Sequence, residues 1–169
     1  AGKRRHKTKM FTDLLDWAAF VVDKWWTSPE KLAIQGGSAG GLLIGAVLNL
    51  QPDVSAAAIL DVAFVDVLNT MLNPDLPLTV GEYLEWGNPN VKEEYGWMRQ
   101  YCPYTNIRPN TTDPAMLLNT SLNDSQVMYW EPAKHIAKLR AVSKSPNVMM
   151  LVTNMAGGHG GSSGRFDAL

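Results

Sequence analysis

The sequence predicts an α/β domain, built as a mostly parallel β-sheet with helices on both faces. Short apolar segments typical of buried strands alternate with longer segments whose apolar residues recur at helical spacing, a pattern typical of parallel sheets. The length of 169 residues lies in the usual range for one domain. Apolar residues make up 46% and charged residues 18%, which is enough to bury a core and excludes an intrinsically disordered chain.

The first sixty residues read as two helix and strand pairs. Four segments are expected in this order: a helix over 10–26, a strand over 31–35, a helix over 39–50 and a strand over 56–60. Thr12 is a candidate cap for the first helix. The first strand stops at Gly36, and Pro52 ends the second helix.

The middle of the chain, residues 73–110, reads as a long excursion from the core. It is rich in Pro, Gly, Asn and aromatic residues, and contains one expected short helix near 93–101. Regular structure is expected again as a strand over 115–118, a helix over 132–142 and a strand over 148–152.

Basic residues gather at the N-terminus. Five of the fifteen Lys and Arg residues lie in the first nine positions: Lys3, Arg4, Arg5, Lys7 and Lys9. We interpret this run as a solvated arm, because nothing else in the sequence favours nucleic-acid binding.

The composition also bears on location. Cys102 is the single cysteine, which excludes an internal disulfide and favours a reducing, cytoplasmic compartment. No stretch approaches the roughly 18 consecutive apolar residues of a membrane helix, so we expect no membrane partner.

The most informative motif is GGSAGG at 36–41, which contains G-x-S-x-G between an expected strand and an expected helix. This is the context of a nucleophile elbow, in which a strained turn presents a serine above the sheet. Gly36 and Gly40 would let the backbone pass close to its neighbours, Ser38 would be the nucleophile, and the Ala39 N–H would face an oxyanion. The alternative, a phosphate-binding turn, lacks the Gly-Lys-Ser/Thr ending of a P-loop.

A serine hydroxyl needs a base, and the chain has three histidines. His6 lies in the basic run, and His135 lies in an expected helix, where a packed or solvated imidazole is the ordinary reading. His159 lies in a glycine-rich loop just after the last expected strand. We therefore assign the base to His159, although a glycine-flanked histidine can also belong to a flexible linker.

The third triad member is expected between serine and histidine, on a loop after a strand. Asp124 meets this requirement, because it follows the strand at 115–118 within a few residues. Its carboxylate would orient the imidazole and stabilise the imidazolium. The plain alternative is that Asp124 is an ordinary turn aspartate. Two other acidic residues fit the triad position less well: Asp113 precedes the strand, and Glu131 opens the next helix, where an acid usually serves the helix dipole.

Four separated motifs resemble the peptidase domain of the prolyl oligopeptidase family, and its oligopeptidase B branch most of all. They are GGSAGG at 36–41, PLTVGEYLEWGNP at 77–89, NDSQVMYWEPAK at 123–134 and GHGGSSGRF at 158–166. The resemblance runs from about residue 2 to residue 166. It implies an α/β-hydrolase fold and a serine peptidase that cuts short peptides after Lys or Arg, with Ser38, Asp124 and His159 as the triad. No metal or cofactor is implied.

The resemblance also suggests how a substrate is selected. In that branch, carboxylates in the segment matching 81–87 receive the basic side chain, and Glu82 matches one of them. Leu84 stands where some members have the second carboxylate, while Glu85 is nearby and is a further candidate. Gln126 replaces an arginine of the proline-specific relatives, which favours the basic-specific branch.

The family's chains are far longer than this one. Neither the β-propeller that gates the peptidase domain nor the first hydrolase strands are found here, and the tyrosine that donates the second oxyanion hydrogen bond would lie upstream. We therefore expect residues 1–169 to be the C-terminal portion of a peptidase domain, incomplete at its N-terminus, with the N-terminal part of the same enzyme as a partner.

Two alternatives remain open. An esterase or acylaminoacyl-peptide hydrolase would use the same triad, because fold does not determine substrate. A truncated, catalytically incompetent fragment would have the motifs without the activity, since the expected strand at 31–35 would lack a neighbour on one side.

Overall fold

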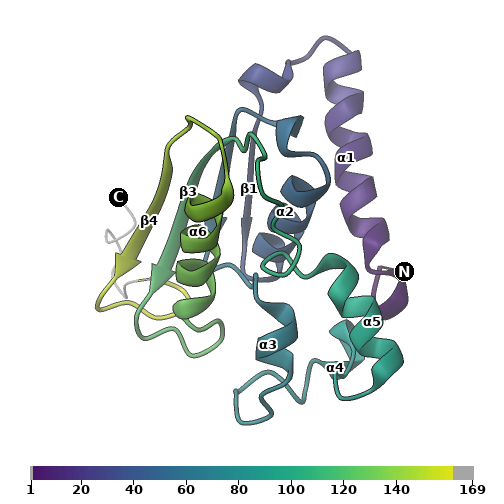
Figure 1. The fold of residues 1–169 in the computed structure, drawn as a ribbon, viewed down its shortest axis with the longest axis vertical. Helices are drawn as coiled ribbons and strands as arrows, with labels where there is room; N and C mark the ends of the chain where they lie inside the picture. The colour runs from purple at the N-terminus through teal and green to yellow at the C-terminus, as the bar shows by residue number, and fades with distance from the viewer. Residues whose placement is uncertain (1, 162–169) are drawn as a thin grey trace.

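The computed structural model describes residues 2–161 and contains one parallel four-stranded sheet (Figure 1). Its strands lie side by side in chain order: β1 (Ala33–Gly37), β2 (Ala57–Asp61), β3 (Ala115–Ser121) and β4 (Met149–Asn154). The α/β class is confirmed. Residues 162–166 of the last sequence motif lie outside the described residues.

Helices α2 (Ala39–Leu50) and α6 (Trp130–Val142) cover one face of the sheet. The covered face is a continuous row across the register, formed by Ile34, Ala58, Met116 and Met149 and, one step further, by Leu60 and Leu118. On the opposite face Met150 and Val152 are each about half exposed, at 48% and 53%.

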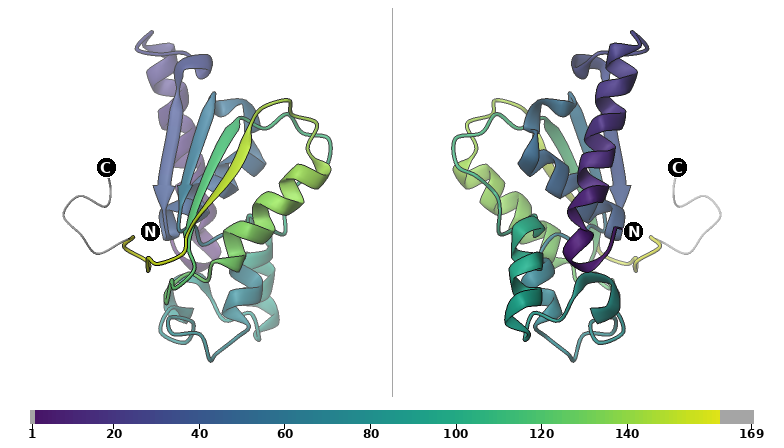
Figure 2. Two further views of the ribbon diagram at one scale, coloured as in Figure 1. Left: turned by 90° about the vertical axis from the view of Figure 1, so that its left-hand side faces the viewer. Right: turned by 90° about the vertical axis from the view of Figure 1, so that its right-hand side faces the viewer.

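The expectation of helices on both faces is therefore wrong for residues 2–161. Each connection between parallel strands leads to the neighbouring strand, and all of them move across the sheet in the same direction. Right-handed connections that all move across the sheet in one direction place their helices on the same face. Figure 2 shows α6 on a single side of the sheet.

The first helix, α1 (Thr8–Asp23), packs against α2 rather than against the sheet. It begins two residues earlier than expected, so Thr12 is not its cap; the Thr12 hydroxyl donates to the Lys9 carbonyl inside the helix. Trp25, with φ of 59°, stands just beyond the helix end. No helix within residues 2–161 is long and apolar enough to cross a bilayer.

The excursion after β2 lies beyond the carboxyl ends of the strands (Figure 1). It contains α5 (Lys92–Tyr101), which was expected, and two shorter helices that were not, α3 (Val67–Met71) and α4 (Tyr83–Trp86). The part of the chain that the structure describes also has three 3₁₀ turns: η1 (Arg4–His6), η2 (Pro29–Lys31) and η3 (Pro52–Val54).

The N-terminal basic run is not a solvated arm. Lys7 is only 2% exposed and forms an ion pair with Glu85 near α4. Arg4 pairs with Glu94 of α5. Two of the five basic side chains are therefore bound to acidic residues of the excursion.

The start of α6 holds a buried carboxyl group. Glu131 is fully buried; its two oxygens accept hydrogen bonds from the Asp66 N–H at 2.8 Å and from the Thr70 hydroxyl at 2.6 Å. Burial raises the pKa of Glu131 to about 7, against the effect of these donors. Glu131 therefore links α6 by hydrogen bonds to α3 and to the residue before it.

We predict that Glu131→Gln becomes more stable relative to the wild type as pH rises from 5 to 8. The folded protein retains the Glu131 proton up to about pH 7, whereas the unfolded chain loses it near 4.5, so wild-type stability falls across this window. We expect a change of roughly 1–3 kcal/mol in the difference between the free energies of unfolding. Denaturant unfolding at several pH values measures it.

The comparison with the wild type isolates Glu131 from His135. Burial lowers the pKa of His135 to about 3, so its neutral form adds stability that is lost as pH falls below about 6.5, and both proteins share this effect. The exposed variant Glu93→Gln is the control. A pH-independent difference for Glu131→Gln would contradict the account.

Candidate active site

The turn between β1 and α2 holds Ser38 in a strained conformation, with φ of 53° and ψ of −119°. Hydrogen bonds on both sides support it. The Ser38 N–H donates to the Asp61 carbonyl at 2.8 Å, and the Phe64 N–H donates to the Ser38 carbonyl at 3.0 Å. The end of β2 and the chain after it therefore hold the elbow, as the strain of such a turn requires.

Two glycines permit the close approach, and they differ in part from those expected. A Cβ at Gly36 would lie 2.3 Å from the Gly40 carbonyl oxygen, and one at Gly41 would lie 2.4 Å from the Ala63 Cβ. A Cβ at Gly40 would meet nothing within 4 Å. Space at Gly40 is therefore not required; the contact needs its carbonyl and the absence of a side chain at Gly36.

Ala39 is the first residue of α2, so its N–H has no acceptor within the helix. The positive end of the helix dipole lies at the same place. The Ala39 N–H adjoins Ser38 and lies where a negative oxygen forming beside the serine would need a donor.

Asp124 lies on the loop after β3 with 5% of its surface exposed. Its Oδ1 accepts hydrogen bonds from the Gln126 N–H at 2.8 Å and the Val127 N–H at 2.9 Å. These two backbone donors fix the orientation of the carboxylate group.

His159 approaches Asp124 from the loop after β4. Its Nδ1 lies 2.8 Å from Asp124 Oδ2 and 3.0 Å from Oδ1. An N–H at Nδ1 donates to the carboxylate and leaves Nε2 free to accept a proton. The other two histidines lie elsewhere: His135 is buried in α6 and His6 contacts Arg5.

Ser38 and His159 do not form a hydrogen bond with each other within residues 2–161. Ser38 borders a pocket with Gln126, whereas His159 borders a separate hollow with Asp61 and Asn119. Both residues lie at the carboxyl edge of the sheet, where ligands bind in open α/β folds. Catalytic hydrogen bonds are often long before substrate binds, so this arrangement is compatible with a triad.

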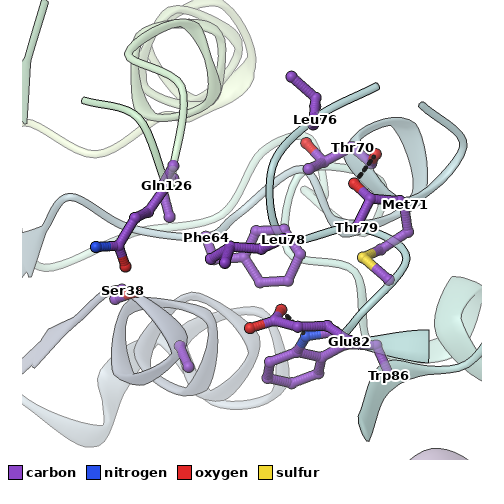
Figure 3. A pocket seen from close by; sticks show the side chains of 12 residues that line it. Ser38, Phe64, Thr70, Met71, Leu76, Leu78, Thr79, Glu82, Trp86 and Gln126 are labelled. Atoms are coloured by element: carbon purple, nitrogen blue, oxygen red, sulfur yellow. Dashed lines mark hydrogen bonds between the residues drawn. The ribbon is translucent and has the colours of Figure 1, made fainter. Parts of the chain in front are cut away.

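The pocket beside Ser38 is mostly apolar, with one carboxylate (Figure 3). Its other lining residues are Ala39, Phe64, Thr70, Met71, Leu76, Leu78, Thr79, Glu82, Trp86, Gln126 and Val127. The Glu82 carboxylate points into the pocket and accepts a hydrogen bond from the Trp86 indole N–H. A single carboxylate in a mostly apolar pocket suits the end of a long cationic side chain.

Glu85, the other acidic candidate, does not line this pocket. Its carboxylate pairs with Lys7. Leu84 is 75% exposed and does not line the pocket either.

Cys102 offers no alternative nucleophile. Its side chain is fully buried, and burial raises the pKa of the thiol. The reactive thiolate is therefore disfavoured.

Sequence reasoning missed the pocket walls. Phe64 and Trp86 contact each other edge to face, with ring centroids 5.4 Å apart, although they lie 22 residues apart in the chain. The high aromatic content of residues 73–110 was the available signal for Trp86, but it did not indicate which ring lines the pocket, and Phe64 lies outside that segment.

We predict that Gly36→Ala destabilises the fold and removes any reactivity of Ser38. Because the new Cβ would press on the Gly40 carbonyl, we expect a loss of roughly 1–3 kcal/mol in the free energy of unfolding. Gly40→Ala is the matched control and should be neutral or stabilising by up to about 1 kcal/mol, since Ala favours a helix. Equal stability of the two variants in denaturant unfolding would refute the packing argument.

This chain is similar to known proteins in both sequence and fold. Among characterised relatives, dipeptidyl aminopeptidase BI of Pseudoxanthomonas mexicana is 46% identical over 165 residues, and Protease 2 of Moraxella lacunata is 45% identical over 168 residues. The matches cover 98% and 99% of this chain but only 23% and 24% of those proteins.

Solved structures of related proteins have a similar fold. Oligopeptidase B from Leishmania major superimposes with a TM-score of 0.90 at 44% identity, and oligopeptidase B from Trypanosoma brucei, with covalently bound antipain, at 0.91 and 41%. These matches cover 93% and 94% of this chain and 22% of each of those chains. The chain thus spans less than a quarter of its relatives' length. The prolyl oligopeptidase family matches residues 1–168, and the chain belongs to this family.

Proposed function

We propose that the protein is a serine peptidase of the oligopeptidase B kind, which hydrolyses short peptides after Lys or Arg. The observation that carries the proposal is the contact between Asp124 and His159, at the same edge of the sheet as the strained Ser38 turn. We also propose that residues 1–169 form the C-terminal portion of an α/β-hydrolase peptidase domain, in line with the share of its relatives that the chain spans.

The reaction follows from these groups. Ser38 Oγ attacks the peptide carbonyl carbon, and His159 Nε2 takes the hydroxyl proton as the Oγ–C bond forms. This step requires the His159 ring to move within hydrogen-bond distance of Ser38. Asp124 keeps the proton on Nδ1 and stabilises the imidazolium, while the Ala39 N–H donates to the oxyanion.

Breakdown of the tetrahedral intermediate completes the cycle. His159 returns the proton to the leaving amine as the C–N bond breaks, which leaves an acyl group on Ser38. Water then attacks the ester carbon and gives its proton to His159. The C–Oγ bond breaks as His159 returns that proton to Ser38 Oγ, and the peptide acid leaves.

Specificity for a basic residue is attributed to Glu82. The carboxylate points into the pocket that Ser38 borders, so a guanidinium or ammonium group reaching it would form a charge-assisted hydrogen bond. Glu85 is not part of this proposal, because it pairs with Lys7.

A second candidate is removal of dipeptides from the N-terminus, the activity that the name of the Pseudoxanthomonas relative states. Its identity to this chain is as high as that of Protease 2. Both activities use the same triad and differ in whether a free amino terminus is required. The two activities are separated by comparing cleavage of one dipeptidyl-arginine substrate with its amino group free and with the same group blocked. Removal of dipeptides requires the free amino group, whereas cleavage after Arg as such does not.

We predict that a fluorophosphonate probe labels the full-length protein at Ser38, and that Ser38→Ala abolishes the labelling. We expect His159→Ala to slow labelling by at least about a thousandfold, because the hydroxyl loses its base. His6→Ala, which removes an exposed histidine, is the matched control. Persistent labelling of Ser38→Ala, or an unchanged rate in His159→Ala, would exclude the proposed nucleophile or base.

We predict that Glu82→Gln lowers the preference for arginine over citrulline, its uncharged isostere, at the residue before the cleaved bond. We expect the ratio of the two kcat/KM values to fall by roughly tenfold to a hundredfold, the range for one hydrogen bond to a charged group. Glu93→Gln, on the exposed surface of α5, is the control. If the ratio stays at its wild-type value in Glu82→Gln, the basic pocket lies elsewhere.

A further inference from the structure

Trp86 lies directly behind the Glu82 carboxylate. Its indole N–H donates to Glu82 Oε2, and its ring packs edge to face on Phe64. The indole is buried, and the Trp86 carbonyl accepts a hydrogen bond from the Tyr101 hydroxyl at 3.3 Å. Because the indole N–H is fixed to the ring, the orientation of the ring decides where the carboxylate is held (Figure 3).

The ammonium group of Lys7 lies over the face of the Trp86 ring. Lys7 Nζ lies 3.9 Å from the ring centroid and also forms an ion pair with Glu85. Lys7 is 2% exposed, although lysine is almost never fully buried unless it is paired. A desolvated ammonium group over an indole face is the strong form of the cation–π interaction.

The segment that carries Lys7 is itself held in place. Arg4 pairs with Glu94, and its guanidinium carbon lies 5.4 Å from the Trp97 ring centroid. The second oxygen of Glu94 accepts the Asn88 N–H at 2.6 Å. The N-terminal turn is therefore attached to α5 and to the chain after α4, so Lys7 has a defined position relative to Trp86.

We propose that Lys7 is a positioning residue for substrate selection: its ammonium group fixes the Trp86 indole, and the indole N–H fixes the Glu82 carboxylate that receives the basic side chain of the substrate. The inference rests on the proposed role of Glu82. It adds a residue from the N-terminal basic run to the machinery that selects the substrate.

The sign of the effect separates positioning from a simple charge effect. Removing the Lys7 charge leaves Glu85 unpaired and makes the region more negative, which by itself would strengthen the attraction of a cationic substrate. Positioning predicts the opposite result, because a mobile carboxylate pairs less well with the guanidinium.

The test is the arginine to citrulline ratio of kcat/KM in the full-length protein. We expect Lys7→Met, which removes the charge and keeps most of the side-chain length, to lower the ratio by about tenfold to thirtyfold, the upper value being that of a desolvated cation–π contact. Fluorophosphonate labelling of Ser38 is measured alongside, because the probe has no basic side chain and reports on Ser38 separately from the selection of arginine. Lys9→Met, at an exposed lysine two residues further on in α1, is the matched control and should leave the ratio unchanged.

A double-mutant cycle tests whether Lys7 acts through Trp86. Trp86→Phe removes the N–H that holds Glu82 and should lower the ratio on its own. In that background, Lys7→Met should not lower the ratio further, whereas an independent loss would multiply with that of Trp86→Phe. If Lys7→Met does not fold, Lys7→Gln, which keeps a donor for Glu85, takes its place with the same expectation.

The outcomes distinguish this inference from the proposed function. A ratio that falls in Glu82→Gln but is unchanged or raised in Lys7→Met overturns the role of Lys7 and leaves the basic pocket standing. Multiplicative effects in the cycle also overturn it. A ratio unchanged in Glu82→Gln overturns the basic pocket, and the positioning role is then overturned with it.

Discussion

The site depends on a backbone constraint, the strained turn that holds Ser38 at φ of 53° and ψ of −119°. A non-glycine residue keeps such a conformation only where its surroundings impose it. Here Asp61 at the end of β2 accepts the serine N–H, and the Phe64 N–H donates to its carbonyl. Gly36 allows the start of α2 to pack closely on the end of β1. Phe64 also lines the neighbouring pocket, so one short segment supports Ser38 and shapes the place where substrate would bind.

Electrostatic pairs organise the remainder of the site. Asp124 receives two backbone N–H groups and then holds His159, so the carboxylate is oriented before the histidine contacts it. Glu131 has a comparable structural role deeper in the fold, where it joins the start of α6 to the start of α3. Thr70, one of its donors, also borders the pocket. The fold therefore connects its buried polar groups to the pocket walls through short hydrogen bonds.

Local sequence patterns predicted much of the fold and all three triad candidates. The Ala39–Leu50 helix has the expected bounds, and Asp124 and His159 could be chosen because each follows an apolar strand. Features that depend on distant contacts could not be predicted. Helices α3 and α4 have five and four residues, too short to show a period. Lys7 was predicted to be solvated because its partners, Glu85 and Trp86, lie far along the chain. For the same reason, the ion pair that holds Glu85 could not be predicted.

We propose that Ser38, His159 and Asp124 act together, although Ser38 and His159 do not form a hydrogen bond with each other within the described residues. The most direct test is a crystal structure of the full-length protein after reaction with a fluorophosphonate. Our account predicts a phosphorus bonded to Ser38 Oγ, His159 Nε2 within hydrogen-bond distance of the adduct, and a phosphonyl oxygen accepting the Ala39 N–H. An adduct on another residue, or a His159 that stays apart from the modified serine, would contradict it.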